Sequence, residues 1–258
     1  EYLFSTNVQT EGKKNIPGLI DEIWEQAIPS SFFLVPQIIA KDRHFTPSND
    51  TITVRSVFSA DEIAILLEWD DRTESLPGDE DAQKIADPEV LYQDMVSIQL
   101  PITVPEGMEK PYFVKGDTEN PVNLWQWASR TTTESQNTSL VKAAGFGTET
   151  ELATNSLAAS GAYENGTWRV IFKRNLTTES IDDLQIQEGI FIPIAFSAWD
   201  GSNGESGTKN TLTTWYWIIL ESESTALPCI GALIALFLVI GLEMLWLRNS
   251  ARRRDPAT

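Results

Sequence analysis

Apolar and polar residues alternate with a period of two along most of the first 220 residues. The alternating runs are rich in β-branched and aromatic residues, which suit a half-buried pleated sheet. The clearest runs are 51–58 (TITVRSVF), 62–69 (EIAILLEW), 95–102 (MVSIQLPI), 167–176 (TWRVIFKRNL), 189–199 (GIFIPIAFSAW) and 213–220 (TTWYWIIL). Each run is long enough for a strand of ordinary length, so the pattern predicts a mainly β domain.

Turn-forming segments separate these runs, among them PSND at 47–50, LPGDEDA at 76–82 and DGSNGESG at 200–207. No long segment in this region has an apolar period of 3.6 residues. Short strands joined by turns favour one antiparallel β-sandwich. Residues 129–160 are rich in Thr, Ser, Ala and Asn, and we expect a long excursion there with one short helix around SLVKAAG at 139–145.

The C-terminal region differs sharply from the alternating part. Residues 226–242 (ALPCIGALIALFLVIGL) carry no charge, and the apolar run extends to residue 247, enough to span a bilayer as a helix. Arginines follow at 248, 252, 253 and 254, which places that end in the cytoplasm. We therefore predict an extracytoplasmic domain over 1–221, a transmembrane helix over 222–247 and a cytoplasmic basic tail over 248–258. A first residue of Glu is typical of an exported chain that has lost its signal.

Charge and composition exclude several functions. The formal net charge is −18, so the surface would repel nucleic acid. A single Cys and a single His rule out an intrachain disulfide, a thioether-linked haem and a Cys/His zinc cluster. No catalytic motif is present, and adjacent acids such as Asp70 and Asp71 are typical of a strand end. We expect no catalytic site, and we interpret His44 in its KDRHFTP turn as a surface residue.

Aromatic residues are unusually frequent, with nine tryptophans in the chain. Many belong to ordinary sandwich cores, but the surplus also suits a pocket for a flat apolar ligand. The segment PYFVKGDTENPVNLWQW at 111–127 places Lys115 among such aromatics.

Six segments, taken in order, resemble the haem-binding gamma subunit family of ethylbenzene dehydrogenase. The family includes the corresponding subunits of selenate and chlorate reductases, of the dimethyl sulfide enzyme and of nitrite oxidoreductase. The resemblance covers about residues 20–220, in the segments IWEQAIPSSFFLVPQ, VRSVFSADEIAILLEWDDRT, DMVSIQLP, PYFVKGDTENPVNLWQW, GTWRVIFKRNL and PIAFSAWDGSNGESGTKNTLTTWYWIIL.

The resemblance implies a β-sandwich that holds one non-covalent haem b and performs no bond-making chemistry of its own. It implies an electron-transfer subunit of a molybdenum oxidoreductase, partnered by an iron–sulfur subunit and a molybdopterin catalytic subunit. Electrons would pass to or from a soluble cytochrome or a membrane quinone-reactive subunit. The anchor would hold this subunit at the cell membrane.

The iron ligands that the family uses are a methionine and a lysine. The methionine of its P-F-F-x-M-G motif corresponds here to Lys115 in PYFVKG, and the lysine corresponds to Lys209 in GTKNTLTTW. Three outcomes stay open. Lys115 itself ligates, which requires a neutral amine that burial against aromatics favours; Met108 replaces it; or the haem is absent and Lys115 is a rim cation.

The remaining candidates for contact with the cofactor are aromatic or basic: Phe113, Trp125, Trp127, Trp215 and, for a haem propionate, Arg174. The alternative hypothesis is a haem-free β-sandwich that binds a ligand such as a sugar or tethers a membrane complex.

Overall fold

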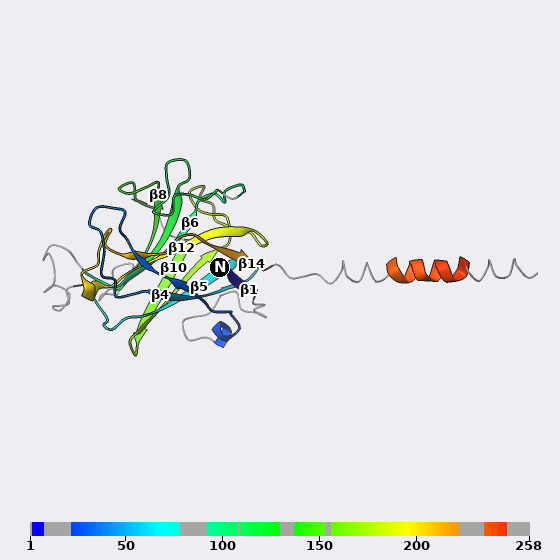
Figure 1. Cartoon of the computed structure of the whole chain (residues 1–258), viewed down its shortest axis with the longest axis horizontal. Coiled ribbons are helices and arrows are strands. Elements are labelled where there is room, and N and C mark those ends of the chain that lie inside the picture. Colours follow the sequence, from blue (N-terminus) through cyan, green and yellow to red (C-terminus); the bar gives the residue numbers. More distant parts are fainter. Residues whose placement is uncertain are drawn as a thin grey trace, which may run out of the picture. The chain divides into compact units, whose positions relative to one another are not determined.

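The computed structural model describes residues 2–7, 22–77, 92–107, 109–129, 137–152, 156–221 and 235–246. The chain divides into two compact units, Glu1–Glu221 and Ser222–Thr258. In the second unit residues 235–246 form an α-helix, drawn in red and orange in Figure 1. Among the described residues, no helix has the length and apolar character needed to cross a bilayer. The rest of the predicted anchor and the tail over 248–258 lie outside the described residues, so the anchor stays a prediction.

The first unit is built almost entirely of strands, as the alternating pattern predicts. They are β1 (Tyr2–Asn7), β2 (Ser30–Phe33), β3 (Val35–Pro36), β4 (Thr51–Phe58), β5 (Glu62–Asp70), β6 (Met95–Pro101), β7 (Val122–Ala128), β8 (Thr138–Ala143), β9 (Thr150–Glu151), β10 (Leu157–Glu164), β11 (Thr167–Asn175), β12 (Phe191–Trp199), β13 (Thr211–Leu212) and β14 (Tyr216–Leu220). Two short 3₁₀ helices complete the described elements, η1 (Glu22–Glu25) and η2 (Gly201–Asn203).

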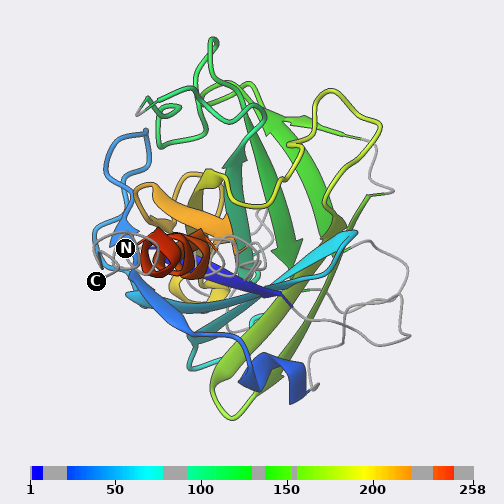
Figure 2. The same cartoon turned by 90° about the vertical axis from the view of Figure 1, so that its right-hand side faces the viewer.

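The strands form a sandwich-like arrangement of two layers. One path of hydrogen-bonded neighbours runs β10-β11-β5-β4-β1-β14-β12-β6-β7-β8-β9. Strand β12 joins the layers, because its first half pairs with β14 and its second half with β6. Figures 1 and 2 show β4 and β5 on one side of the interior and β6 and β8 on the other.

The sheet is mixed and not purely antiparallel, which corrects one part of the predicted class. Strand β1 lies parallel to both of its neighbours, β14 and β4. Period-two alternation reports which face of a strand is buried, but it carries no information about strand direction. The other pairings in the described residues are antiparallel.

The expected helix around residues 139–145 is wrong. Residues 138–143 form β8, which pairs along its whole length with β7. Leu140 and Val141 are buried there, so packing against the neighbouring strand outweighs the helix propensity of the alanines that follow. The Ala-rich segment 157–164 likewise forms a strand, β10, because it pairs with all of β11 up to the turn at Asn165 and Gly166.

The main core lies between the two layers and contains four of the nine tryptophans. Trp69 and Trp168 are cross-strand partners in β5 and β11, with ring centroids 6.2 Å apart. Trp127 reaches them from β7 and meets the Trp168 ring edge-on at 5.0 Å. Gly161 in β10 makes room for Trp127, since a Cβ there would lie 2.3 Å from the Trp127 ring. This aromatic cluster joins the two layers.

Candidate functional site

A narrow cavity lies on the face of β12, β6 and β7 that points away from the main core. Its floor is a single row across the sheet, because Ser97 of β6 is the cross-strand partner of both Ser197 in β12 and Gln126 in β7. The lining is mixed. Its apolar residues are Phe113, Val114, Leu124, Phe146, Trp199 and Leu212, and its polar ones include Gln37, Gln99, Thr208 and Asn210. The hydroxyl of Ser97 is buried on the floor and has no hydrogen-bond partner among the described residues. The floor therefore offers a free polar group inside the cavity.

Lys115 lies at the rim of this cavity, in the loop between β6 and β7. Both Lys115 (φ 60°) and Gly116 (φ 71°) adopt left-handed backbone conformations, and a Cβ on Gly116 would come within 2.8 Å of Asn120 O. This requirement explains Gly116, whereas Lys115 adopts a conformation that is uncommon for a residue with a side chain. The turn closes with a hydrogen bond from Gly116 N to Tyr112 O.

The side chain of Gln99, on β6, fixes this turn to the sheet. Its Nε2 donates to Phe113 O at 2.9 Å, and its Oε1 accepts from Lys115 N at 3.0 Å. Gly145 N donates to Lys115 O at 2.8 Å. All backbone polar groups of Lys115 are thereby paired, so the base of its side chain is held firmly over the cavity.

The amine of Lys115 is engaged by an acid. Its Nζ lies 2.6 Å from Glu149 Oε1 and 5.5 Å from the centre of the Phe146 ring. Partial burial acts to raise the pKa of Glu149, but the hydrogen bond and charge of Lys115 outweigh it, and the pKa is lowered. Ligation of a metal by Lys115 therefore requires the amine to leave Glu149 and to lose its proton.

The loop that carries Lys209 forms the opposite wall of the cavity. Thr208 and Asn210 line it, while Lys209 itself is exposed. Gln37 holds this loop in place, because its Nε2 donates to Thr208 O at 2.8 Å and its backbone N donates to Asn210 O. The structure thus brings the Lys115 turn and the Lys209 loop to one cavity.

The predicted aromatic contacts divide between the two faces of the sheet. Phe113 lines the cavity, and Trp215 packs beside it in a small apolar cluster with Leu124, where its Nε1 donates to Pro111 O. Trp125 and Trp127 lie in the main core on the opposite face of β7. Residues two apart in a strand share a face, so Leu124 and Gln126, not the two tryptophans, face the cavity.

Arg174 also lies on the core side. It is 2% exposed, stacks on the Trp125 ring at 5.2 Å and donates to the carbonyl oxygens of Leu184 and Asn175. Burial lowers its pKa to about 10, against the opposing charge of Asp183. The structure gives this guanidinium a structural environment away from the cavity. Met108 lies outside the described residues.

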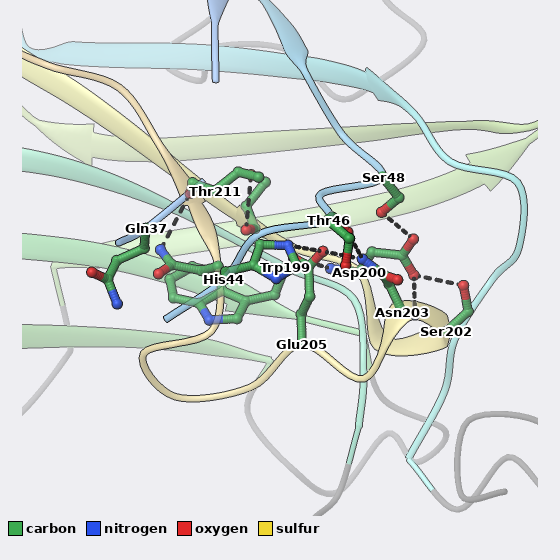
Figure 3. Close-up of polar contacts among 12 residues, drawn as sticks. Gln37, His44, Thr46, Ser48, Trp199, Asp200, Ser202, Asn203, Glu205 and Thr211 are labelled. Atoms are coloured by element: carbon green, nitrogen blue, oxygen red, sulfur yellow. Dashed lines mark hydrogen bonds and ion pairs between the residues drawn. The ribbon is translucent and has the colours of Figure 1, made fainter. Parts of the chain in front are cut away.

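Behind the Lys209 loop lies a buried ionisable pair (Figure 3). His44 is 4% exposed, so the expectation of a surface residue is wrong; its Nε2 lies 3.0 Å from Glu205 Oε1. Burial raises the pKa of Glu205 to about 7. The pKa of His44 is lowered, mainly by burial and also by the charge of Lys209. Both shifts favour an uncharged pair that joins segment 37–48 to the loop after β12.

The cavity matches a haem in the donor groups it offers but not in its size. The donor chemistry fits, because the amine-bearing residue Lys115 lies at the rim of the cavity and aromatic side chains form part of its walls. The enclosed space is about 20 Å³, room for one water molecule. A porphyrin therefore requires the rim to open, and the ion pair of Lys115 with Glu149, beside Phe146, forms part of that rim.

Sequence reasoning missed Gln99, Glu149 and the serine row. The alternation along β6 could have revealed Ser97 and Gln99, since both lie on the face opposite the apolar residues Val96 and Ile98. Glu149 lies in the loop between β8 and β9, and no local pattern connects it to Lys115.

The fold and cavity define a β-sandwich protein with a lysine at the rim of a small cavity outside its core. The family model described as "Ethylbenzene dehydrogenase" matches residues 21–153 and 150–211. These matches cover well over half of the chain, and the chain belongs to this family.

Two curated relatives are similar to the chain. "Putative respiratory nitrate reductase heme subunit ORF7" of Haloferax mediterranei is 25% identical over 169 residues, covering 66% of this chain and 55% of that protein. "Chlorate reductase subunit gamma" of Ideonella dechloratans is 25% identical over 172 residues, covering 67% of this chain and 65% of that protein. The chain thus spans less than two thirds of the length of either relative.

Among solved structures, a family 9 carbohydrate-binding module from Caldicellulosiruptor kristjanssonii in complex with cellotriose matches with a TM-score of 0.48 and 13% identity. The match covers 88% of this chain and 96% of that one.

Proposed function

We propose that this protein is the haem b electron-transfer subunit of a multi-subunit molybdenum oxidoreductase. Family membership and the names of the two relatives, a nitrate reductase haem subunit and a chlorate reductase gamma subunit, support this role. The subunit performs no bond-making chemistry and relays electrons between an iron–sulfur subunit, next to the molybdopterin subunit, and an external carrier or quinone pool.

One observation carries the proposal: the Lys115 turn and the Lys209 loop face one cavity. Gln99 and Gly145 fix the backbone of Lys115 there, and Gln37 fixes the loop around Lys209. Bound haem supplies a one-electron redox centre whose potential depends on its axial ligands and on a dry surrounding. Lys115 and Lys209 are the proposed iron ligands, and Met108 stays the alternative to Lys115 that the family resemblance leaves open.

The remaining predicted residues have different parts in this proposal. Phe113 would contact the haem, since it lines the cavity, and Trp215 belongs to the apolar cluster against which Phe113 packs. Trp125, Trp127 and Arg174 build the core layer beneath β7, so their effect on the haem is indirect.

Exposed apolar side chains around the cavity support docking of a partner there. Ile38 and Ile39 follow Gln37, Tyr112 precedes Phe113, and Phe146 lines the mouth itself. Contiguous exposed apolar surface at a binding site is typical of a protein contact. We place the iron–sulfur subunit at this rim, with the domain on the extracytoplasmic side and a helix within 222–247 as its anchor.

Haem retention tests the site directly. The full chain is reconstituted with haem b in detergent, and the Soret absorbance per protein is measured. Lys115→Ala should lose at least half of the bound haem or change its spin state, because one axial ligand is gone. Lys142→Ala is the matched control, since Lys142 forms an ion pair of the same 2.6 Å length with Asp182. A wild-type chain without a Soret band would contradict the proposal.

The second candidate, a haem-free sandwich that binds another ligand or tethers the complex, is favoured by the closed cavity and the Lys115–Glu149 ion pair. This candidate predicts that Lys115→Ala has the same haem content as wild type and as the control Lys142→Ala.

A further inference from the structure

Three buried aspartates meet at one end of the sandwich. Asp71 follows β5, Asp94 precedes β6 and Asp200 follows β12, so the cluster joins one layer to the other. One carboxylate oxygen from each lies within 4.8 Å of those from the other two. Asp94 is fully buried, and the other two are each 4% exposed.

No positive charge neutralises these acids within the described part of the chain. None of the ion pairs found there includes Asp71, Asp94 or Asp200. Burial raises the pKa of Asp71 to about 8, with further contributions from the charges of Asp94 and Asp200, and burial raises that of Asp94 to about 6. Buried carboxylates without a counter-charge are costly, so the cluster needs either a proton or a cation.

Two of the carboxylates are already well supplied with hydrogen bonds. Asp94 accepts from Ser75 N, Gly201 N and the indole Nε1 of Trp168, at 2.7–2.9 Å. Asp200 accepts from Ser48 Oγ and Ser202 Oγ, as Figure 3 shows, and from Asn203 N. These hydrogen bonds fix the directions of both carboxylates.

Asp71 is different. Its Oδ1 accepts from Thr73 N, but its buried Oδ2 has no partner among the described residues. The indole Nε1 of Trp69 is near enough to act on the pKa of Asp71, yet it too is buried without a hydrogen-bond partner in those residues. A shared proton would satisfy Asp71 Oδ2 and leave Trp69 unpaired. A hydrated cation satisfies both, because Asp71 coordinates it and a bound water accepts from Trp69.

We propose that Asp71, Asp94 and Asp200 bind a calcium ion that joins the two layers of the sandwich. All the ligand atoms are oxygens, the donors that hard divalent cations prefer. Calcium binds oxygen at 2.3–2.6 Å, so two of its ligands lie no further apart than about 5 Å, which the cluster satisfies. Water completes the coordination. The ion also fixes the start of the loop that carries Lys209, since Asp200 caps η2.

Terbium luminescence is the direct test, because Trp168 donates to Asp94 and would sensitise a lanthanide bound there. The full chain, stripped with EDTA, is titrated with Tb³⁺ under indole excitation and then with Ca²⁺. We expect saturable emission from one site, displaced by Ca²⁺, and weakened at least tenfold in affinity by Asp71→Asn. Asp70→Asn, an exposed neighbour with the same charge change, should leave the emission unchanged.

Thermal unfolding gives a second measurement that does not depend on the probe. At a Ca²⁺ concentration a hundredfold above its Kd, the midpoint of the wild-type chain should rise by roughly 5–10 °C. Asp71→Asn should abolish this rise while the chain still folds. The proposal would be overturned in favour of a shared proton by three results together. These are the absence of sensitised emission, an unfolding midpoint that does not depend on Ca²⁺, and an Asp71→Asn variant that is more stable than wild type. Neither readout requires haem, so this test is independent of the proposed function.

Discussion

Gln99 determines where the backbone of Lys115 lies. The side-chain amide pairs with two backbone groups of the 113–115 turn, and Lys115 then projects from a strained left-handed residue over the cavity. Positioning of this kind is what an axial ligand needs, because a loosely held amine would stay in water with its proton. The site therefore depends as much on Gln99 as on the lysine.

Replacing Gln99 by Leu should destabilise the domain by about 2 kcal/mol, because Phe113 O and Lys115 N lose their partner. Urea unfolding followed by tryptophan fluorescence measures this change. Haem affinity should fall as well, since the turn is released. Gln126→Leu is the matched control: Gln126 lies on the same cavity floor but makes one long contact, 3.5 Å, with Ser139. Equal losses in both variants would argue against a specific role for Gln99.

At the scale of elements, the sequence predicts strands well and their partners poorly. Alternation locates β4, β5, β6, β11, β12 and β14, because each has one face in the core. It fails for β8 and β10, where small residues carry little signal and pairing with β7 and β11 decides the structure. The parallel direction of β1 and the meeting of the Lys115 turn with Glu149 depend on the path of the whole sheet.

The contact between segment 37–48 and the loop after β12 should depend on pH. Glu205 has a folded pKa of about 7, above its usual 4.5, so its contribution is fully present at pH 4.5 and is lost as the pH rises through 7. Glu205→Gln removes this titration. Relative to wild type, the variant should therefore gain on the order of 2 kcal/mol of stability between pH 5.5 and pH 8.5.

Unfolding in urea at the two pH values measures this difference, and Glu188→Gln, an exposed acid, is the control. Loss of stability in Glu205→Gln at both pH values would show that Glu205 is charged in the folded protein and that the pair is a conventional salt bridge.

At the scale of the whole molecule, the main core and the candidate site lie on opposite faces of the strands β12, β6 and β7. Tryptophans fill the interior, while serines, Gln99 and the two lysine-bearing loops form the outer site. Family membership and the position of Lys115 were both accessible from the sequence. The placement of Trp125, Trp127 and Arg174 in the core, and the cluster of three aspartates, required the fold, because their partners come from distant strands.

The reduction potential of the haem-loaded protein tests the central claim most directly. Lys115→Met introduces the residue type that the family resemblance implies at this position, and a thioether ligand favours reduced iron more than an amine does. If Lys115 is an iron ligand, this variant should retain its haem and have a distinctly higher reduction potential than wild type in a redox titration. The control variant Lys142→Met should have the same reduction potential as wild type. An unchanged potential in Lys115→Met, with an unchanged spectrum, would show that Lys115 does not bind the iron.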